Sequence, residues 1–173
     1  LTQKEISRKI KSGEKFSIRL LVQREKILSF SDNVYGNFEV NSSNIEDYII
    51  LRSNGMPTYN FSAAIDDCLM KITHVIRGED HLSNTPKQIL IQEALELKRP
   101  EYAHLPLILS PDRSKLSKRH GGTSVTEYKN MGYLPQALLN LMALMGWHPS
   151  DEREIFSLEE LAREFDLARV QKA

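Results

Sequence analysis

The sequence contains a single cysteine, Cys68, and this scarcity excludes two kinds of structure. One cysteine cannot form a disulfide within the chain, and it cannot supply a cysteine-rich zinc site. Long hydrophobic runs are also missing, since none approaches the roughly 20 apolar residues that a membrane-spanning helix requires. These absences are typical of a protein of the reducing cytoplasm, and we expect it to be cytoplasmic and to act without a membrane.

The chain also lacks a net charge, because 23 lysines and arginines balance 23 aspartates and glutamates. No overall field therefore favours DNA or another polyanion, and any site for phosphate groups must be local. With 40% apolar and 27% charged residues over 173 positions, the composition is that of a globular protein with one sizeable core. Positive charge gathers in one stretch, SPDRSKLSKRHGG at residues 110–122.

The first sixty residues predict a β-rich segment with one helix. TQKE at residues 2–5 is a capping-box pattern, and Gly13 is suited to end that helix. Short β-branched or aromatic runs then indicate strands, and their connections are too short for crossover helices, so we expect mostly antiparallel pairing. These runs are residues 16–22, 26–32, 37–40 and 47–52. The Asn-Gly pair after the last run predicts a hairpin with residues 57–61.

From residue 61 the pattern alternates between helix and strand. Residues 61–70 predict a helix, residues 72–77 a strand, and Thr85 with Gln88 matches a T-x-x-Q capping box that opens the next helix. The continuous apolar run HLPLIL at residues 104–109 predicts a strand covered on both faces. Strand, helix and strand of this length form a βαβ unit, so the sequence predicts an α/β fold with a parallel sheet.

After the basic stretch the chain is predicted to be helical. SVTE at residues 124–127 and SLEE at residues 157–160 are capping-box patterns. Residues 134–147 predict a helix that is apolar nearly all round and must therefore be buried. We expect a domain boundary near residue 123, where the composition changes.

The basic stretch has almost no side chain able to pack into a core, and it follows a predicted buried strand. Ligands of open α/β folds usually bind at the carboxyl edge of such a sheet. Lys115 and Lys118 are three residues apart and Ser117 adds a hydroxyl, so one turn would bring all three to a polyphosphate. A solvated surface loop is the alternative interpretation, and composition alone does not separate the two.

A second polar group, RGEDHLSN at residues 77–84, follows another predicted strand and faces the same edge of the sheet. Arg77 suits bidentate binding of a carboxylate or phosphate, while Glu79 or Asp80 suits the hydroxyls of a ribose. The alternative is an internal arginine–carboxylate network that holds the turn. His81 has no partner at metal-ligand spacing, so no metal site is expected. Tyr59 ends the predicted hairpin and is expected to point toward the same region.

These motifs resemble those of bacterial-type glutamyl-tRNA synthetase, a class I aminoacyl-tRNA synthetase, over essentially the whole chain. Lys115-Leu116-Ser117-Lys118-Arg119 is similar to that family's KMSKS loop. The other matching segments are GMPTYNFSAAIDDCLMKITHVIRGEDHLSNTPKQ, AHLPLILS and GYLPQALLNLMALMGW. Four such segments in the right order carry the resemblance, which implies the second half of a Rossmann-type catalytic domain.

The resemblance implies a two-step reaction with L-glutamate, ATP and tRNA(Glu). Glutamate attacks ATP to form glutamyl-adenylate, and the glutamyl group then passes to the terminal ribose of the tRNA. Lys118 would contact the phosphates of ATP, which enters as its Mg²⁺ complex, while Lys115 and Arg119 support closure of the loop. The remaining implied assignments are glutamate binding by Tyr59 and Arg77, and ATP binding by Ser117, Asp80 and Glu79.

The family's HIGH motif is absent from these residues, as are the zinc ligands of the family's insertion. The chain therefore resembles an internal fragment: the end of the β-rich connective insertion at residues 1–50, the second half of the Rossmann domain with the KMSKS loop at residues 51–122, and the start of the helical stem-contact region at residues 123–173. We expect the full-length enzyme to be active and this fragment alone to be inactive.

Two alternatives differ in function. The shorter paralogue that glutamylates queuosine in a tRNA shares the catalytic core, although the intact lysine-serine-lysine-arginine loop favours the synthetase. A non-catalytic phosphate- or RNA-binding module would use the same basic loop without any chemistry. A glutaminyl enzyme is disfavoured because GEDHLSNTPKQ and KLSKRHGG are similar to the glutamyl type.

Overall fold

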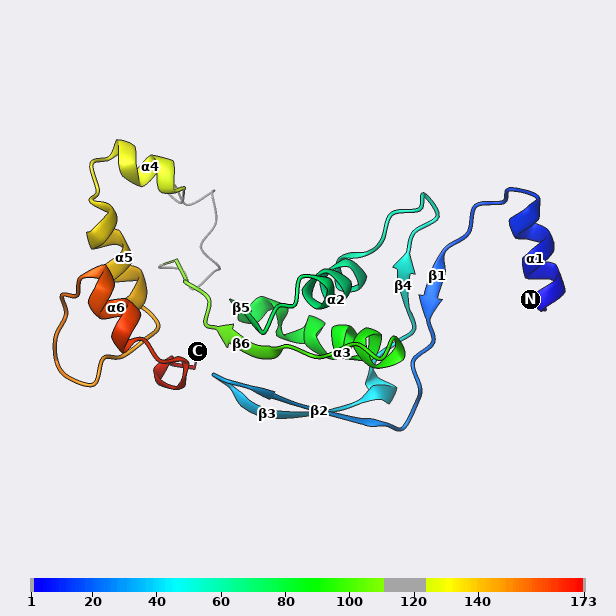
Figure 1. The fold of residues 1–173 in the computed structure, drawn as a ribbon, viewed down its shortest axis with the longest axis horizontal. Coiled ribbons are helices and arrows are strands. Elements are labelled where there is room, and N and C mark those ends of the chain that lie inside the picture. The colour runs from blue at the N-terminus through cyan, green and yellow to red at the C-terminus, as the bar shows by residue number, and fades with distance from the viewer. Residues whose placement is uncertain (1, 111–123, 173) are drawn as a thin grey trace. The chain divides into compact units, whose positions relative to one another are not determined.

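The computed structural model describes residues 2–110 and 124–172, and Figure 1 shows their helices and strands. These residues form two compact units whose segments alternate along the chain. Unit 1 comprises Leu1–Phe30, Asn37–Thr73 and Ser83–Pro100, and unit 2 comprises Ser31–Gly36, His74–Leu82 and Glu101–Ala173. Helices and strands are mixed, and one sheet includes parallel strands, which confirms the predicted α/β class. The expected domain boundaries near residues 50 and 122 stay predictions.

Strands β5 (His74–Gly78) and β6 (Glu101–Leu105) form the parallel pair that the sequence predicts. Their register runs from His74 opposite Glu101 to Gly78 opposite Leu105. The chain between them contains helix α3 (Thr85–Ala94), because parallel strands cannot be joined by a short turn. This pairing confirms the predicted βαβ unit.

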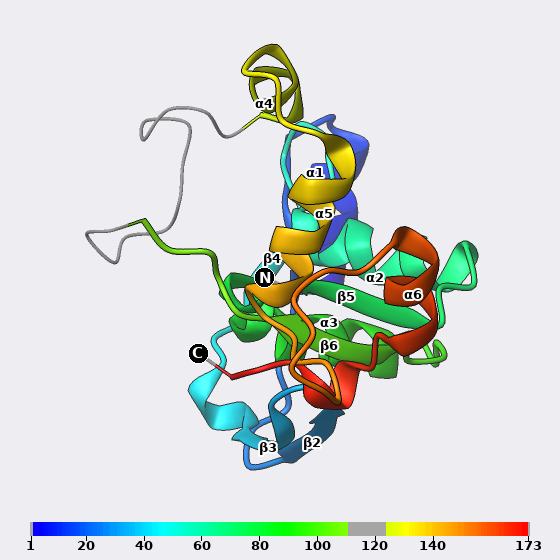
Figure 2. The same cartoon turned by 90° about the vertical axis from the view of Figure 1, so that its left-hand side faces the viewer.

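Strands β2 (Ile27–Asp32) and β3 (Gly36–Asn41) are joined by a turn at residues 33–35, so they form an antiparallel hairpin (Figure 2). The strand order of the sheet is β3-β2-β6-β5, and β2 runs parallel to β6 where Asp32 lies opposite Tyr102. The expectation of mostly antiparallel pairing is confirmed for the pairs within the first sixty residues, and the parallel contact of β2 with the later strand β6 is the exception. A short connection constrains only strands adjacent in sequence, and it says nothing about a partner that follows much later.

Strand β6 lies earlier in the chain than the apolar run predicted. Its buried residues are Tyr102, Ala103 and His104, whereas Ile108 and Leu109 are exposed beyond its end. Pro106 has no backbone N–H to donate, so the hydrogen-bonded ladder ends before it. The predicted strand at residues 104–109 is therefore wrong in position.

Unit 1 contains a second sheet, in which β1 (Ile18–Leu20) pairs antiparallel with β4 (Tyr48–Leu51). After β4 the chain turns at Gly55, whose φ of 80° favours glycine. One bridge joins Leu51 to Pro57, and helix α2 (Tyr59–Leu69) then begins where the second strand was expected. Arg52 N–H donates to Met56 O and Thr58 N–H donates to Ile50 O on either side of this bridge. The predicted hairpin is wrong beyond these two bonds, because helix α2 begins directly after Thr58.

Helices α2 and α3 pack together within unit 1, and their contact corrects the predicted cap. The N-cap of α3 is Asn84 rather than Thr85, and no side chain caps the helix. The Gln88 side chain is buried and donates to Asn60 Oδ1 on α2 at 3.3 Å. The T-x-x-Q box is therefore wrong, since Gln88 serves the contact between the two helices instead.

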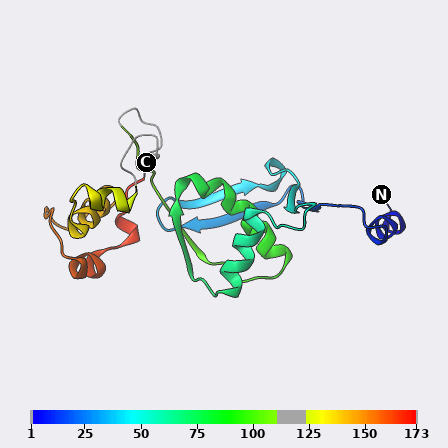
Figure 3. The same cartoon turned by 90° about the horizontal axis from the view of Figure 1, so that it is seen from above.

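Helix α1 (Gln3–Lys11) begins with the predicted capping box of Thr2 and Glu5. Gly13 follows the helix with a φ of 76°, as expected of the residue that ends it. No residue of α1 is buried. Figure 3 shows α1 at the end of an extended segment that leads to β1.

The C-terminal part of unit 2 is helical. Its elements are α4 (Val125–Asn130), α5 (Pro135–Leu144), α6 (Leu158–Glu164) and the 3-10 helix η4 (Leu167–Arg169). Of these, α5, α6 and η4 contribute to the hydrophobic cluster that contains Trp147. The predicted capping boxes that start at Ser124 and Ser157 are both present. The hydrophobic cluster of unit 2 comprises Val34, Ala103, Trp147, Phe156, Leu161 and Val170.

Helix α5 forms as predicted, but none of its residues is buried within the described part of the chain. The exposed fractions of Leu139, Leu141 and Met142 are 44%, 56% and 55%. The prediction of a buried helix is therefore wrong for these residues. An apolar pattern favours burial of a helix, but it does not determine which element of the protein packs against it. No helix among residues 2–110 and 124–172 is long and apolar enough to cross a membrane.

Candidate functional site

The candidate site of unit 2 is centred on Arg77, near the carboxyl end of β5. The parallel register places Arg77 opposite His104 on β6. In this pair the Arg77 Nε–H donates to His104 Nε2 at 3.1 Å. The register of two strands that are distant in sequence therefore sets the orientation of the guanidinium.

Behind His104 lies Asp32, the last residue of β2. The Asp32 carboxylate contacts His104 Nδ1 at 2.6 Å, and both side chains are 0% exposed. The same carboxylate accepts backbone hydrogen bonds from Val34 at 3.0 Å, Tyr35 at 2.9 Å and His104 at 3.1 Å. Asp32 is therefore held by the backbone of the turn after β2 and of β6, and its position is tightly determined.

These contacts determine the tautomer of His104. An ionised carboxylate only accepts hydrogen bonds, so His104 Nδ1 must carry the proton that it donates to Asp32. Arg77 only donates, so His104 Nε2 must be the acceptor. The imidazole is therefore neutral and bridges a buried carboxylate to the guanidinium.

The pKa values of both groups agree with this assignment. Burial has the largest effect on His104 and lowers its pKa below the ordinary value; Arg77 and His81 act in the same direction, against the opposing effect of Asp32. Burial also has the largest single effect on Asp32 and would raise its pKa. The hydrogen bonds from Tyr35, His104 and Val34 outweigh it, so the pKa of Asp32 is lowered. The charge pattern at neutral pH is therefore an ionised Asp32 beside a neutral His104.

This pattern predicts acid-sensitive stability. Because the pKa of His104 is lower in the folded protein than in the unfolded chain, the unfolded chain binds more protons between those two values. Stability should therefore be complete above about pH 6.5 and fall as the pH drops toward the lowered pKa, with a further loss from Asp32 below about pH 3.8. Thermal unfolding of the full-length protein from about pH 7.5 to about pH 5 measures the first step.

The matched variants for this measurement are His104→Gln and His74→Gln. The first removes the buried imidazole and should flatten the pH dependence of the melting temperature. His74 lies on the same strand with a side chain that is 46% exposed and pairs with Glu101, so its replacement should leave the slope intact. An unchanged slope in His104→Gln would contradict the assignment.

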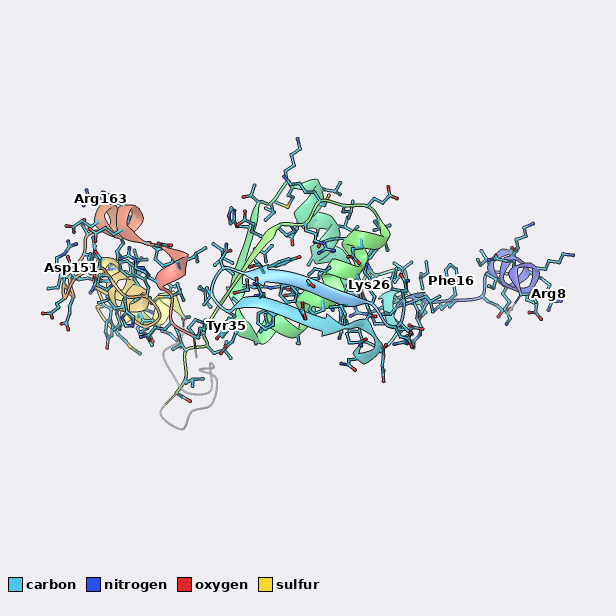
Figure 4. The ribbon with its side chains drawn as sticks, turned by 90° about the horizontal axis from the view of Figure 1, so that it is seen from below. Arg8, Phe16, Lys26, Tyr35, Asp151 and Arg163 are labelled. Carbon is cyan, nitrogen blue, oxygen red and sulfur yellow. The ribbon has the colours of Figure 1, made fainter. Side chains whose placement is uncertain are left out.

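Glu79 and Asp80 open the 3-10 helix η2 (Glu79–Asn84), which follows β5 directly. Glu79 is already engaged within unit 2: Oε2 accepts from the Tyr35 hydroxyl, and Oε1 accepts from the Leu107 backbone N–H at 3.2 Å. Tyr35, labelled in Figure 4, lies at the turn between β2 and β3. Glu79 therefore links this turn to the segment after β6, in keeping with an internal role for this carboxylate.

Asp80, in contrast, is exposed, and its carboxylate lies over the backbone of Gly78. A Cβ added at Gly78 would come within 2.6 Å of Asp80 Oδ1. Only glycine therefore lets the Asp80 carboxylate keep this position. Among the two predicted acidic residues, Asp80 is the one that faces solvent.

Of the other predicted site residues, the structure describes only Tyr59. Tyr59 is the first residue of α2 in unit 1, where its side chain is 51% exposed. The basic residues Lys115, Ser117, Lys118 and Arg119 lie outside the described residues. Within residues 2–110 and 124–172, no group of three or more histidine, cysteine, aspartate or glutamate side chains could hold a metal ion.

Sequence reasoning missed Asp32 and His104 as parts of the site. Asp32 occupied the end of a predicted strand, and His104 began an apolar run that was assigned to the core. A signal was present, because a charged or polar residue at a buried strand position needs a partner. The identity of that partner depends on strands that are far apart in sequence.

Comparisons of the sequence with known proteins all identify the same family. The family model described as tRNA synthetases class I (E and Q), catalytic domain, matches residues 1–173. The glutamate–tRNA ligase 1 of Caldanaerobacter subterraneus is 52% identical over 172 residues, which is 99% of this chain and 36% of that protein. The glutamate–tRNA ligase of a Hydrogenobaculum species is 54% identical over 171 residues, covering 98% of this chain and 37% of that protein.

Solved structures give the same result. The glutamate–tRNA synthetase of Elizabethkingia anophelis matches with a TM-score of 0.90 and 38% identity, covering 100% of this chain and 39% of that one. A glutamate–tRNA ligase from Elizabethkingia meningosepticum, solved in complex with its amino acid, matches with a TM-score of 0.91 and 38% identity, covering 100% of this chain and 38% of that one. The chain thus spans somewhat more than a third of the length of these proteins.

Proposed function

The chain belongs to the class I glutamyl- and glutaminyl-tRNA synthetase family, as part of its catalytic domain, and from this we propose that the full-length protein attaches glutamate to tRNA(Glu). The observation that carries the proposal is identity of about half over nearly the whole chain to proteins named glutamate–tRNA ligase. The arginine held at the end of β5 supports it, because a fixed guanidinium is suited to a carboxylate substrate.

The proposed reaction has two steps. An α-carboxylate oxygen of glutamate attacks the α-phosphorus of ATP, the bond to pyrophosphate breaks, and glutamyl-adenylate forms. A hydroxyl of the terminal tRNA ribose then attacks the activated carbonyl, and AMP leaves. Neither step needs a covalent bond to the protein, so the chain contributes positioning and charge stabilisation.

Each proposed residue has a role in that scheme. Arg77 binds a carboxylate of glutamate with the Nη groups of its guanidinium, while Nε stays on His104. Tyr59 contacts the same substrate, and Asp80 binds ATP. Asp80 is preferred to Glu79 because its side chain is exposed at this edge of the sheet, whereas Glu79 is half-buried.

The basic loop acts on the phosphates in this proposal. ATP enters as its Mg²⁺ complex, and Lys115 and Lys118 place two ammonium groups against the charge that builds up on the departing pyrophosphate. Ser117 adds a hydroxyl donor, and Arg119 supports closure of the loop. The helices α4, α5 and α6 follow this loop in sequence and are proposed to belong to the region that contacts the tRNA stem.

Glutamate-dependent exchange between pyrophosphate and ATP tests the proposal in the full-length protein with tRNA(Glu) present. We expect exchange, together with transfer of labelled glutamate to an unmodified tRNA(Glu) transcript. Such a transcript contains no queuosine, so glutamate transfer to it separates the synthetase from the paralogue that modifies queuosine. The isolated 173-residue chain should show no exchange, because the HIGH motif is absent from its sequence.

The outcomes separate the alternatives. A full-length protein that exchanges no pyrophosphate yet binds tRNA would be the non-catalytic module instead. Exchange by the isolated chain would contradict the expectation that this segment depends on the rest of the protein.

A further inference from the structure

We propose that Asp32 and His104 are positioning residues that hold the Arg77 guanidinium in the orientation that receives glutamate. The inference rests on the proposed function, since it assumes that Arg77 binds a carboxylate of that substrate. Neither residue would touch glutamate or ATP in this scheme. Both would act through Arg77 alone.

The first argument is the continuity of the hydrogen bonds. Three backbone N–H groups fix the Asp32 carboxylate, and this carboxylate fixes His104 through Nδ1 at 2.6 Å. His104 then accepts from Arg77 Nε at 3.1 Å. The orientation of a long, flexible side chain is thereby tied to the backbone of β6 and of the turn after β2 within unit 2.

The second argument is directionality. The guanidinium can point its Nε–H only at an acceptor, and His104 Nε2 is an acceptor only while Nδ1 keeps its proton. Asp32 enforces this tautomer, because a carboxylate at Nδ1 requires a donor there. Removing Asp32 or protonating His104 would abolish the acceptor that faces Arg77.

The third argument is energetic. An arginine that is free to rotate must lose rotamer freedom when it binds substrate, and this loss weakens binding. A guanidinium already oriented in the free protein avoids most of that loss. A positioning role therefore predicts an effect on the affinity for glutamate with little effect on the affinity for ATP.

Two isosteric variants separate positioning from a purely structural role. An asparagine at position 104 can place its amide nitrogen near the site of Nδ1 and keep the bond to Asp32, but it is too short to reach Arg77. A glutamine can place its amide oxygen near the site of Nε2 and accept from Arg77, but it loses the bond to Asp32. The asparagine variant should therefore be the more stable of the two, and the glutamine variant should bind glutamate more tightly.

In the full-length protein, His104→Asn should raise the KM for glutamate roughly 10- to 30-fold, as expected for the loss of a hydrogen bond to a charged group. His104→Gln should raise it less, by about threefold, because it keeps an acceptor for Arg77 that Asp32 no longer holds in place. The KM for ATP should change less than about twofold in both. His104→Gln should nevertheless melt at the lower temperature, since it leaves the buried Asp32 without its side-chain partner.

His74→Gln is the control, because His74 lies on the strand of Arg77 but pairs with Glu101 at 3.3 Å. It should leave both KM values unchanged. A double variant provides the second test: if His104 acts only through Arg77, His104→Asn should add little to Arg77→Lys, whereas independent effects would multiply.

Failure of the inference and failure of the proposed function look different. If wild-type protein does not activate glutamate, the proposed function is wrong. If wild type is active and Arg77→Ala loses affinity for glutamate, yet His104→Asn leaves the KM for glutamate within about twofold, only the positioning role is overturned. Equal increases in the KM for glutamate and the KM for ATP would also overturn it, because they would indicate general damage to the fold.

Discussion

Replacing Lys118 with alanine in the full-length protein should slow formation of glutamyl-adenylate roughly 30- to 1,000-fold, equivalent to about 2–4 kcal/mol of activation free energy. The reason is that charge moves onto the departing pyrophosphate in the transition state. An ammonium group placed there stabilises the transition state more than the bound ATP, so its loss should lower kcat more than it raises the KM for ATP. Single-turnover formation of the adenylate is the direct measurement.

Lys129→Ala is the matched control for this prediction. Lys129 is an exposed lysine of α4, the helix that follows the basic loop in sequence, so its replacement removes the same charge from the same part of the chain. It should leave adenylate formation within about twofold of wild type. Equal rates for the Lys118→Ala variant and the wild type would contradict the proposed role of the basic stretch and favour the alternative interpretation, a solvated surface loop.

Replacing Arg77 with alanine should raise the KM for glutamate roughly 30- to 150-fold, because hydrogen bonds to a charged group contribute about 2–3 kcal/mol when one partner is removed. The KM for ATP should change little, because the proposed partner of Arg77 is the amino acid. Arg77→Lys should give an intermediate effect of about tenfold, since an ammonium keeps the charge but loses the planar fork and the Nε–H that faces His104.

Arg163→Ala serves as the control for the arginine variants. Its side chain lies on α6, is 71% exposed and approaches Glu164 only at 3.8 Å, so its removal should change neither KM value. The proposed role of Arg77 would be refuted if Arg77→Ala bound glutamate normally, or if the KM for ATP rose as much as the KM for glutamate. Melting temperatures of each variant, measured alongside, separate a loss of affinity from unfolding.

Local sequence patterns predicted much of the fold correctly. The capping boxes that start at Thr2, Ser124 and Ser157 are all present, and the strands of the first fifty residues lie close to their predicted positions. A cap depends on residues only three positions apart, so the sequence contains all the information needed to predict it. The T-x-x-Q pattern at Thr85 failed for the opposite reason, because α2 supplied a partner for Gln88 from a distant part of the chain.

The sequence alone predicted a site at the basic stretch and at Arg77 with its acidic neighbours, and the resemblance of its motifs identified the family to which the chain belongs. The pairing of β2 with β6 and the bonds from Asp32 to His104 and from His104 to Arg77 emerged only from the folded chain. Asp32 and His104 are 72 residues apart, and Arg77 and His104 are 27 apart. Partners at such separations are chosen by strand order and register, which depend on the packing of the whole unit, whereas a motif depends only on its immediate neighbours.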